Sequence, residues 1–96
     1  MIREREIERK LKKMIEGYGG VCLKWNSGEA GVPDRICLLP GGTVIFVETK
    51  KPKGGRLSKL QEYQIGRLRD LGFRCWVLWN DADFQALDMI IRERAL

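Results

Sequence analysis

The sequence predicts an α/β fold, with a mixed four-stranded sheet flanked by helices in the order α-β-β-β-α-β-α. Two segments, "TVIFV" and "CWVLW", are apolar at consecutive positions, which is typical of strands covered on both faces. A glycine turn joins two strand-like segments in the middle of the chain. A helix-like segment separates the last two strands, so the strand at 73–79 is predicted to run parallel to the strand at 43–49.

The first helix is predicted over residues 2–17. Its apolar side chains fall on one stripe at helical spacing, namely Ile7, Leu11, Met14, Ile15 and, just beyond, Tyr18. The segment "GYGG" ends this helix. "VCLKWN", residues 21–26, is then a predicted strand, and "SGEAGVP" a loop.

The segments "DRICLL" and "TVIFVETK" flank "PGG", which predicts a β-hairpin. After the basic loop "KPKGGR", Ser58 and Gln61 have the spacing of a capping box and begin a helix over 58–71. A strand over 73–79 follows. We expect Asp81 to cap a last helix over about 82–94.

Composition restricts the class of protein. The 96 residues suffice for one domain, 1–96, and leave no room for a second core. A net charge of +5 and a pI near 9.4 favour a polyanionic partner, although a solvated basic surface is the simpler alternative. The sequence has no histidine, which excludes Ser-His and Cys-His nucleophile pairs. Any chemistry must use carboxylates, lysine, hydroxyls or a hard metal ion.

The cysteines and the N-terminus indicate an intracellular protein. Cys22, Cys37 and Cys75 lie in predicted strands without a C-x-x-C motif, so we expect buried thiols in a reducing compartment. The segment "MIREREIERK" has no apolar region of the kind found in signal peptides. No apolar run approaches the roughly 20 residues that span a bilayer.

Three charged residues stand on the most strand-like part of the chain: Asp34, Glu48 and Lys50. Glu48 and Lys50 share one face of their strand because alternate residues point the same way. The hairpin register decides where Asp34 lies. If Leu39 pairs with Thr43, Asp34 sits opposite Glu48, whereas a shift by one residue separates the two carboxylates.

Two ionised carboxylates that lie close together repel each other unless a cation lies between them. Oxygen ligands of this kind suit Mg²⁺ or Mn²⁺, and the backbone carbonyl of Thr49 could be a third ligand. Lys50 at the rim could orient or deprotonate a water, or stabilise charge on a phosphate. The alternative is a surface aspartate beside an ordinary Glu–Lys pair on an edge strand.

Pro33-Asp34, Glu48 and Lys50 match the PD-(D/E)xK nuclease signature, and the element order is similar to the restriction-endonuclease-like core of that superfamily. "GVPD", "VETK" and "LSKLQ" together resemble the VRR-NUC domain family over roughly residues 4–79. The resemblance implies metal-dependent hydrolysis of phosphodiester bonds. It assigns metal binding to Asp34 and Glu48 and catalysis to Lys50.

The resemblance also extends to the two helices before and after the hairpin. Such families often carry a further glutamate on the first helix, for which we choose Glu8 ahead of Glu4. Gln61 matches the glutamine of "LSxxQ", with Gln64 as a weaker candidate, although Gln61 could serve the capping box alone. Stand-alone members are similar to Holliday-junction resolvases, which implies a homodimer acting on branched DNA.

Basic residues near the proposed metal are candidates for binding DNA phosphates. Those in the loop after Lys50 and in the following helix are Lys51, Lys53, Arg56 and Lys59; Lys24 and Arg35 are further candidates. A solvated loop, or pairing with an acid, is the alternative. We interpret the three tryptophans, Trp25, Trp76 and Trp79, as core or interface residues.

The main hypothesis is therefore a Mg²⁺- or Mn²⁺-dependent endodeoxyribonuclease, acting in the cytoplasm or nucleoid of a host cell. The compact stand-alone domain suggests a viral or mobile-element origin. A non-catalytic DNA-binding module with a nuclease-like fold is the second hypothesis. A small interaction protein with an incidental basic surface is the third.

Overall fold

A computed structural model describes residues 4–93 and has the predicted order of elements. These elements are α1 (Glu4–Gly17), β1 (Val21–Lys24), β2 (Arg35–Leu39), β3 (Thr43–Thr49), α2 (Lys59–Asp70), β4 (Arg74–Leu78) and α3 (Asp81–Arg92). The expected start of the first helix at residue 2 and the expected end of the last at residue 94 lie outside the described residues. The predicted α/β class is confirmed.

The four strands form one mixed sheet in the order β1-β2-β3-β4. The first three strands are antiparallel neighbours, and β4 returns parallel to β3 after the α2 crossover, as predicted. In the hairpin, Leu39 pairs with Thr43 and Arg35 pairs with Val47. This is the first of the two registers considered above, and its continuation puts Asp34 opposite Glu48.

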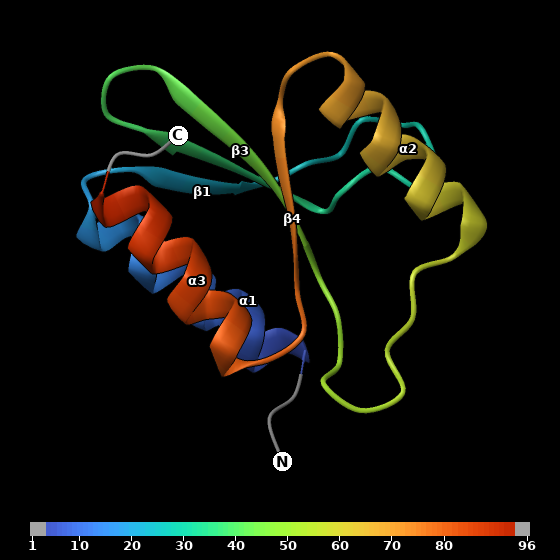
Figure 1. Ribbon diagram of the computed structural model, residues 1–96, viewed down its shortest axis with the longest axis horizontal. Helices are drawn as coiled ribbons and strands as arrows, with labels where there is room; N and C mark the ends of the chain where they lie inside the picture. The colour runs from blue at the N-terminus through green and yellow to red at the C-terminus, as the bar shows by residue number, and fades with distance from the viewer. Residues whose placement is uncertain (1–3, 94–96) are drawn as a thin grey trace.

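Helices cover both faces of the sheet, with α1 and α3 on one side and α2 on the other (Figure 1). The larger core lies under α1 and α3. It contains Ile7, Leu11 and Ile15 of α1, Phe84, Leu87 and Ile91 of α3, and Ile45 and Val47 of β3, among others. The smaller core lies under α2, where Ile65 packs with Phe46 and Cys75. Consecutive residues of β3 therefore enter different cores, which explains its unbroken apolar sequence.

Both later helices begin with a capping box. Ser58 caps α2 as predicted, and its side chain accepts a hydrogen bond from the backbone N–H of Gln61. The prediction that Asp81 caps α3 is wrong, because Asn80 is the cap and pairs with Asp83. Asn80 is as good a cap as aspartate, and its side-chain oxygen accepts a hydrogen bond from the backbone N–H of Asp83, three residues ahead.

The cysteines, Trp25 and Trp76 lie where the sequence predicts, whereas Trp79 is half-buried and belongs to neither core. Cys22, Cys37 and Cys75 are buried and free. The rings of Trp25 and Phe46 lie 5.0 Å apart, and Trp76 packs against the larger core. Within the described residues, no helix is both long and apolar enough to cross a membrane.

Candidate nuclease active site

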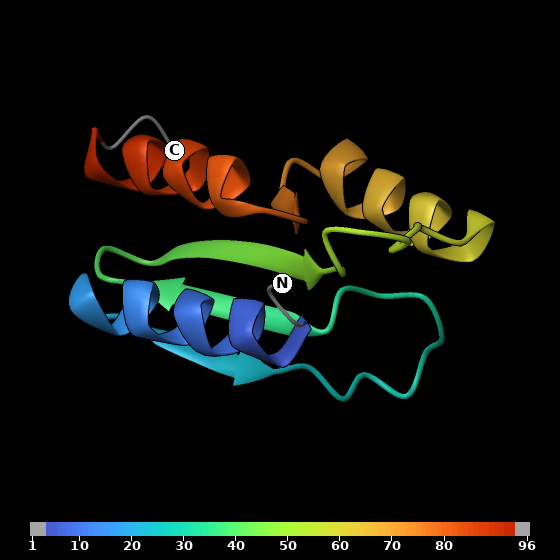
Figure 2. The same ribbon diagram turned by 90° about the horizontal axis from the view of Figure 1, so that it is seen from below.

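The predicted site residues gather at the end of the sheet where β3 terminates. Asp34 directly precedes β2, Glu48 and Thr49 end β3, and Lys50 follows at once. Gln61 lies in the first turn of α2. Figure 2 shows the β1–β2 loop and the segment between β3 and α2 at this same end of the molecule. Local sequence thus places an acid at the start of one strand and a second acid at the end of its antiparallel neighbour.

Asp34 is linked to α1 through the hydroxyl of Thr49. The Thr49 Oγ1 lies 3.4 Å from Asp34 Oδ2 and 3.5 Å from Glu8 Oε1. Glu8 Oε2 in turn accepts a hydrogen bond from Arg35 at 3.3 Å. The other carboxylate oxygen of Asp34, Oδ1, is buried and has no hydrogen-bond partner. The site therefore contains an acceptor that protein groups leave unused.

Glu48 lies on the α2 side of the sheet and is only 5% exposed. Its Oε2 accepts a hydrogen bond from Gln61 Nε2 at 3.2 Å and lies 3.6 Å from Lys50 Nζ. The side chain of Lys50 is 17% exposed. The structure thus brings together Glu48, Lys50 and Gln61 on one side, and Asp34, Thr49 and Glu8 on the other; the Glu4 side chain is outside the described part.

Both central carboxyl groups hold protons more tightly than usual. Burial, followed by the negative charge of Glu8, raises the pKa of Asp34 from 3.8 to about 6. Burial, followed by the negative charge of Asp34, raises the pKa of Glu48 from 4.5 to about 7, although Lys50 opposes the shift. Ionising both groups therefore costs free energy, which a nearby cation would offset.

These shifts predict that the metal-free protein loses stability as pH rises from about 4 to about 7. A carboxyl whose pKa is higher in the folded state binds protons that the unfolded state has released, so unfolding becomes easier over that interval. Urea denaturation in EDTA at several pH values measures this slope. The double variant Asp34→Asn/Glu48→Gln should flatten it, and an unchanged slope in that variant would contradict the assignment.

Gln61 performs two structural tasks at once. Its Oε1 accepts a hydrogen bond from the Ser58 backbone N–H at 2.9 Å, while its Nε2 donates to Glu48. The sequence left open whether Gln61 serves the cap alone or also the site. The structure assigns it contacts to both.

We expect Gln61→Ala to lower stability by about 0.5–2 kcal/mol, the usual effect of losing a cap, and to lower activity as well. Ser58→Ala is the matched control, because it removes the cap and leaves the Gln61–Glu48 contact possible. The two variants should be compared by urea denaturation and by single-turnover cleavage. Equal activity losses in both would show that Gln61 acts only as a capping residue.

A loop contact that the sequence did not predict holds the segment before Asp34. Gln64, which is 3% exposed, donates from Nε2 to the Ala30 carbonyl at 3.2 Å and to Glu29 Oε1 at 3.4 Å. Arg67 also binds Glu29, at 3.3 Å. Gln64, our weaker candidate, thus has no contact with Glu48 and fastens the β1–β2 loop to α2 instead. The sequence signal for this contact was a polar residue, Gln64, beside the buried Ile65 on α2.

The candidate phosphate-binding residues fall into two groups. The exposed ones are Lys24, Lys51, Lys53, Arg56 and Lys59. Arg35 is different, since its side chain is 18% exposed and paired with Glu8. The loop after Lys50 is anchored by Trp79, whose Nε1 donates to the Gly55 carbonyl at 3.2 Å. The exposed lysine and arginine side chains of this loop therefore belong to a segment that is hydrogen-bonded to the residue just after β4.

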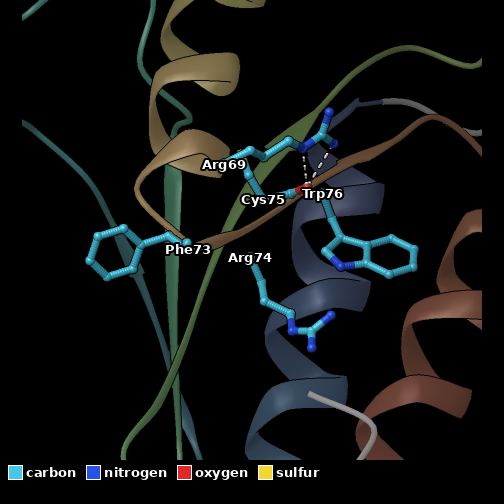
Figure 3. Close-up of a pocket in the computed structure, with 6 residues that line it drawn as sticks. Arg69, Phe73, Arg74, Cys75 and Trp76 are labelled. Atoms are coloured by element: carbon cyan, nitrogen blue, oxygen red, sulfur yellow. Dashed lines mark hydrogen bonds between the residues drawn. The ribbon is translucent and has the colours of Figure 1, made fainter.

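A hollow lies away from the candidate site, at the opposite end of the sheet around the start of β4 (Figure 3). There Arg69 donates two hydrogen bonds to the Cys75 carbonyl, at 2.7 and 3.2 Å. The arginine thereby occupies an acceptor of the edge strand. The hollow is lined by Arg69, Gly72, Phe73, Arg74, Cys75 and Trp76 and contains no carboxylate, so it is not the candidate site.

Comparisons with known proteins agree with this description. No family model matches the chain. The chain is 40% identical over 92 residues to the protein named "Putative nuclease p44" of Acyrthosiphon pisum secondary endosymbiont phage 1. That match covers 95% of this chain and 94% of the phage protein. A solved structure described as a "VRR_NUC domain" has a TM-score of 0.79 and 29% identity, covering 93% of this chain and 94% of that one.

The fold and these similarities define the class of protein: an α/β domain with the architecture of a nuclease. The chain belongs to the VRR-NUC domain family. The family resemblance inferred from "GVPD", "VETK" and "LSKLQ" is therefore confirmed.

Proposed function

We propose that the chain forms a single nuclease domain, residues 1–96, that hydrolyses DNA phosphodiester bonds with the help of Mg²⁺ or Mn²⁺. One observation carries the proposal: the half-buried Asp34 and the buried Glu48 lie close enough for the charge of Asp34 to raise the pKa of Glu48, and Lys50 and Gln61 lie beside Glu48. Membership in the family and the nuclease relative support the same function.

The residues present fit a hard divalent cation. Asp34 Oδ1 is a buried acceptor without a partner, and both central carboxyl groups have raised pKa values. Among residues 4–93 there is no group of three or more His, Cys, Asp or Glu side chains that could hold a metal on its own. This suits Mg²⁺, which proteins commonly bind through one or two carboxylates while waters and substrate phosphates complete the shell. The proposed ligands are Asp34, Glu48 and the Thr49 backbone carbonyl, with Glu8 as the fourth. Because the three carboxylates do not form a ligand group as they stand, ion binding would have to draw them together.

When bound, the cation would neutralise charge that develops on the phosphate oxygens. The chain's own groups would supply the rest. In the reaction a water oxygen bonds to phosphorus and gives up a proton, the bond from phosphorus to the leaving oxygen breaks, and the leaving oxygen gains a proton, so that protons balance overall. Lys50 Nζ, held beside Glu48, would donate hydrogen bonds to the attacking water or to a phosphate oxygen. Gln61 would keep the Glu48 carboxylate in place.

The finer parts of the proposal concern the substrate and the assembly. We propose a homodimer that resolves four-way junctions, because two related sites could cut symmetric strands and one small chain has little surface for reading a junction. The exposed lysines and Arg56 near Lys50 would bind the DNA backbone. The phage origin of the relative supports a virus-encoded protein that acts in the cytoplasm or nucleoid of its host.

The proposal is tested by incubating the purified protein with a labelled four-way junction and a matched linear duplex, in Mg²⁺, Mn²⁺ or EDTA. We expect paired symmetric cuts in the junction that are lost in EDTA and in Lys50→Ala. Lys13→Ala is the control, since Lys13 is an exposed lysine on α1 that is not part of the proposed site. Salt-sensitive DNA binding without cleavage under any metal condition would favour the non-catalytic module instead.

A further inference from the structure

Arg35 is the one candidate DNA-binding residue that the structure turns inward. It begins β2 directly after Asp34, and its guanidinium donates to Glu8 Oε2 at 3.3 Å. We propose that Arg35 is a positioning residue that holds Glu8 for metal binding. This inference rests on the proposed function, because Glu8 is a ligand only if the site binds a cation.

The contacts of Glu8 support this role. Its carboxylate has one oxygen toward Arg35 and the other 3.5 Å from the Thr49 hydroxyl, which itself lies 3.4 Å from Asp34. The Arg35 contact therefore holds Oε2 and leaves Oε1 beside the Thr49 hydroxyl, which is also close to Asp34. Carboxylates that bind metals are commonly oriented by hydrogen bonds to their second oxygen, and losing such a partner weakens metal binding.

Charge balance explains why Glu8 needs a positively charged side chain beside it. Glu8 is the largest source of charge repulsion on Asp34. Without a positive partner, the flexible Glu8 side chain would turn toward solvent, away from that repulsion. Arg35 supplies the partner from the neighbouring strand. Its side chain and that of Glu8 are 18% and 26% exposed, so solvent screens this pair only in part.

The burial of Arg35 also argues against a direct role on DNA. Its Nε is buried and has no hydrogen-bond partner, so only part of the guanidinium could reach a phosphate. Lys24 is directly opposite Arg35 on β1, is exposed, and makes no hydrogen bond or ion pair among the described residues. Lys24 is therefore a matched control: a neighbouring cation on the same face of the sheet that lacks the Glu8 contact.

The test measures Mn²⁺ affinity without DNA, by titration calorimetry, for the full chain and five variants: Arg35→Gln, Arg35→Lys, Glu8→Gln, the double variant Glu8→Gln/Arg35→Gln and Lys24→Gln. We expect Arg35→Gln to weaken binding about 10–100-fold, the usual effect of losing an orienting partner. Glu8→Gln should weaken it at least as much, and the double variant should equal Glu8→Gln alone. Lys24→Gln should leave the affinity unchanged, and Arg35→Lys should restore part of the loss.

A second measurement separates positioning from DNA contact. The salt dependence of DNA binding in EDTA should keep its slope in Arg35→Gln, whereas loss of a phosphate contact would reduce the slope by about one. The inference is overturned if Arg35→Gln reduces the slope, or if it changes the melting temperature without changing Mn²⁺ affinity. It is also overturned if Glu8→Gln binds Mn²⁺ as wild type does. That last outcome leaves the proposed function intact. The proposed function itself fails only if the wild-type protein neither binds Mn²⁺ nor cleaves DNA.

Discussion

Glu48→Gln is expected to abolish metal-dependent cleavage and, at the same time, to stabilise the metal-free protein. Glutamine keeps the shape of the side chain and its contact with Gln61, but it removes a charge that is buried and repelled by Asp34. Stability should rise by about 1–3 kcal/mol at pH 8, because a pKa raised by a unit corresponds to about 1.4 kcal/mol. Activity should fall by at least about 10²–10³-fold.

These two effects are measured by urea denaturation in EDTA and by single-turnover cleavage. Glu62→Gln is the control, because Glu62 is an exposed acid in the first turn of the same helix as Gln61. Its stability and activity should both remain close to wild type. A Glu48→Gln protein that is less stable than wild type at pH 8 would show that the carboxylate serves the fold rather than the site.

Mg²⁺ or Mn²⁺ should stabilise the folded protein, and the effect should grow with pH. A ligand that binds only the folded state adds about 2.7 kcal/mol at one hundred times its dissociation constant. The metal competes with the protons on Asp34 and Glu48, whose pKa values are about 6 and about 7. Stabilisation should therefore be large at pH 8 and small at pH 5.

Melting temperatures with Mg²⁺ and with EDTA at the two pH values test this expectation. Asp34→Asn should remove most of the metal effect at pH 8, while Lys53→Ala should retain it. Equal stabilisation of wild type and Asp34→Asn by Mg²⁺ would mean that the ion binds elsewhere on the protein.

Much of the fold follows from short-range patterns in the sequence. The unbroken apolar segment of β3 predicted cover on both faces, and the structure divides its residues between two cores. The hairpin was predicted from its glycine turn, but its register was not, because a slip of one residue fits the same turn chemistry. Packing decides between the two, since the observed register keeps Cys37 and Ile45, which pair across the hairpin, in the core under α1.

The outer parts of the candidate site were harder to predict because they depend on contacts between distant elements. Arg35 and Glu8 were each assigned a separate task, and only the packing of α1 on the sheet shows that they pair. Thr49 was considered for its backbone carbonyl alone, whereas its hydroxyl lies between Asp34 and Glu8. Side chains that bridge elements leave no periodic signal in the sequence.

The most direct test of the central claim is single-turnover cleavage of a four-way junction in Mn²⁺ by wild type and by Asp34→Asn, prepared in parallel. One oxygen of Asp34 is buried and unpaired, and its carboxylate makes no hydrogen bond or ion pair with Lys50 or Gln61. Asp34→Asn therefore removes the proposed metal ligand and leaves the contacts of those two residues in place. We predict paired cuts by wild type and none above background by Asp34→Asn, with junction binding retained. Cleavage by Asp34→Asn at the wild-type rate would contradict the proposed active site.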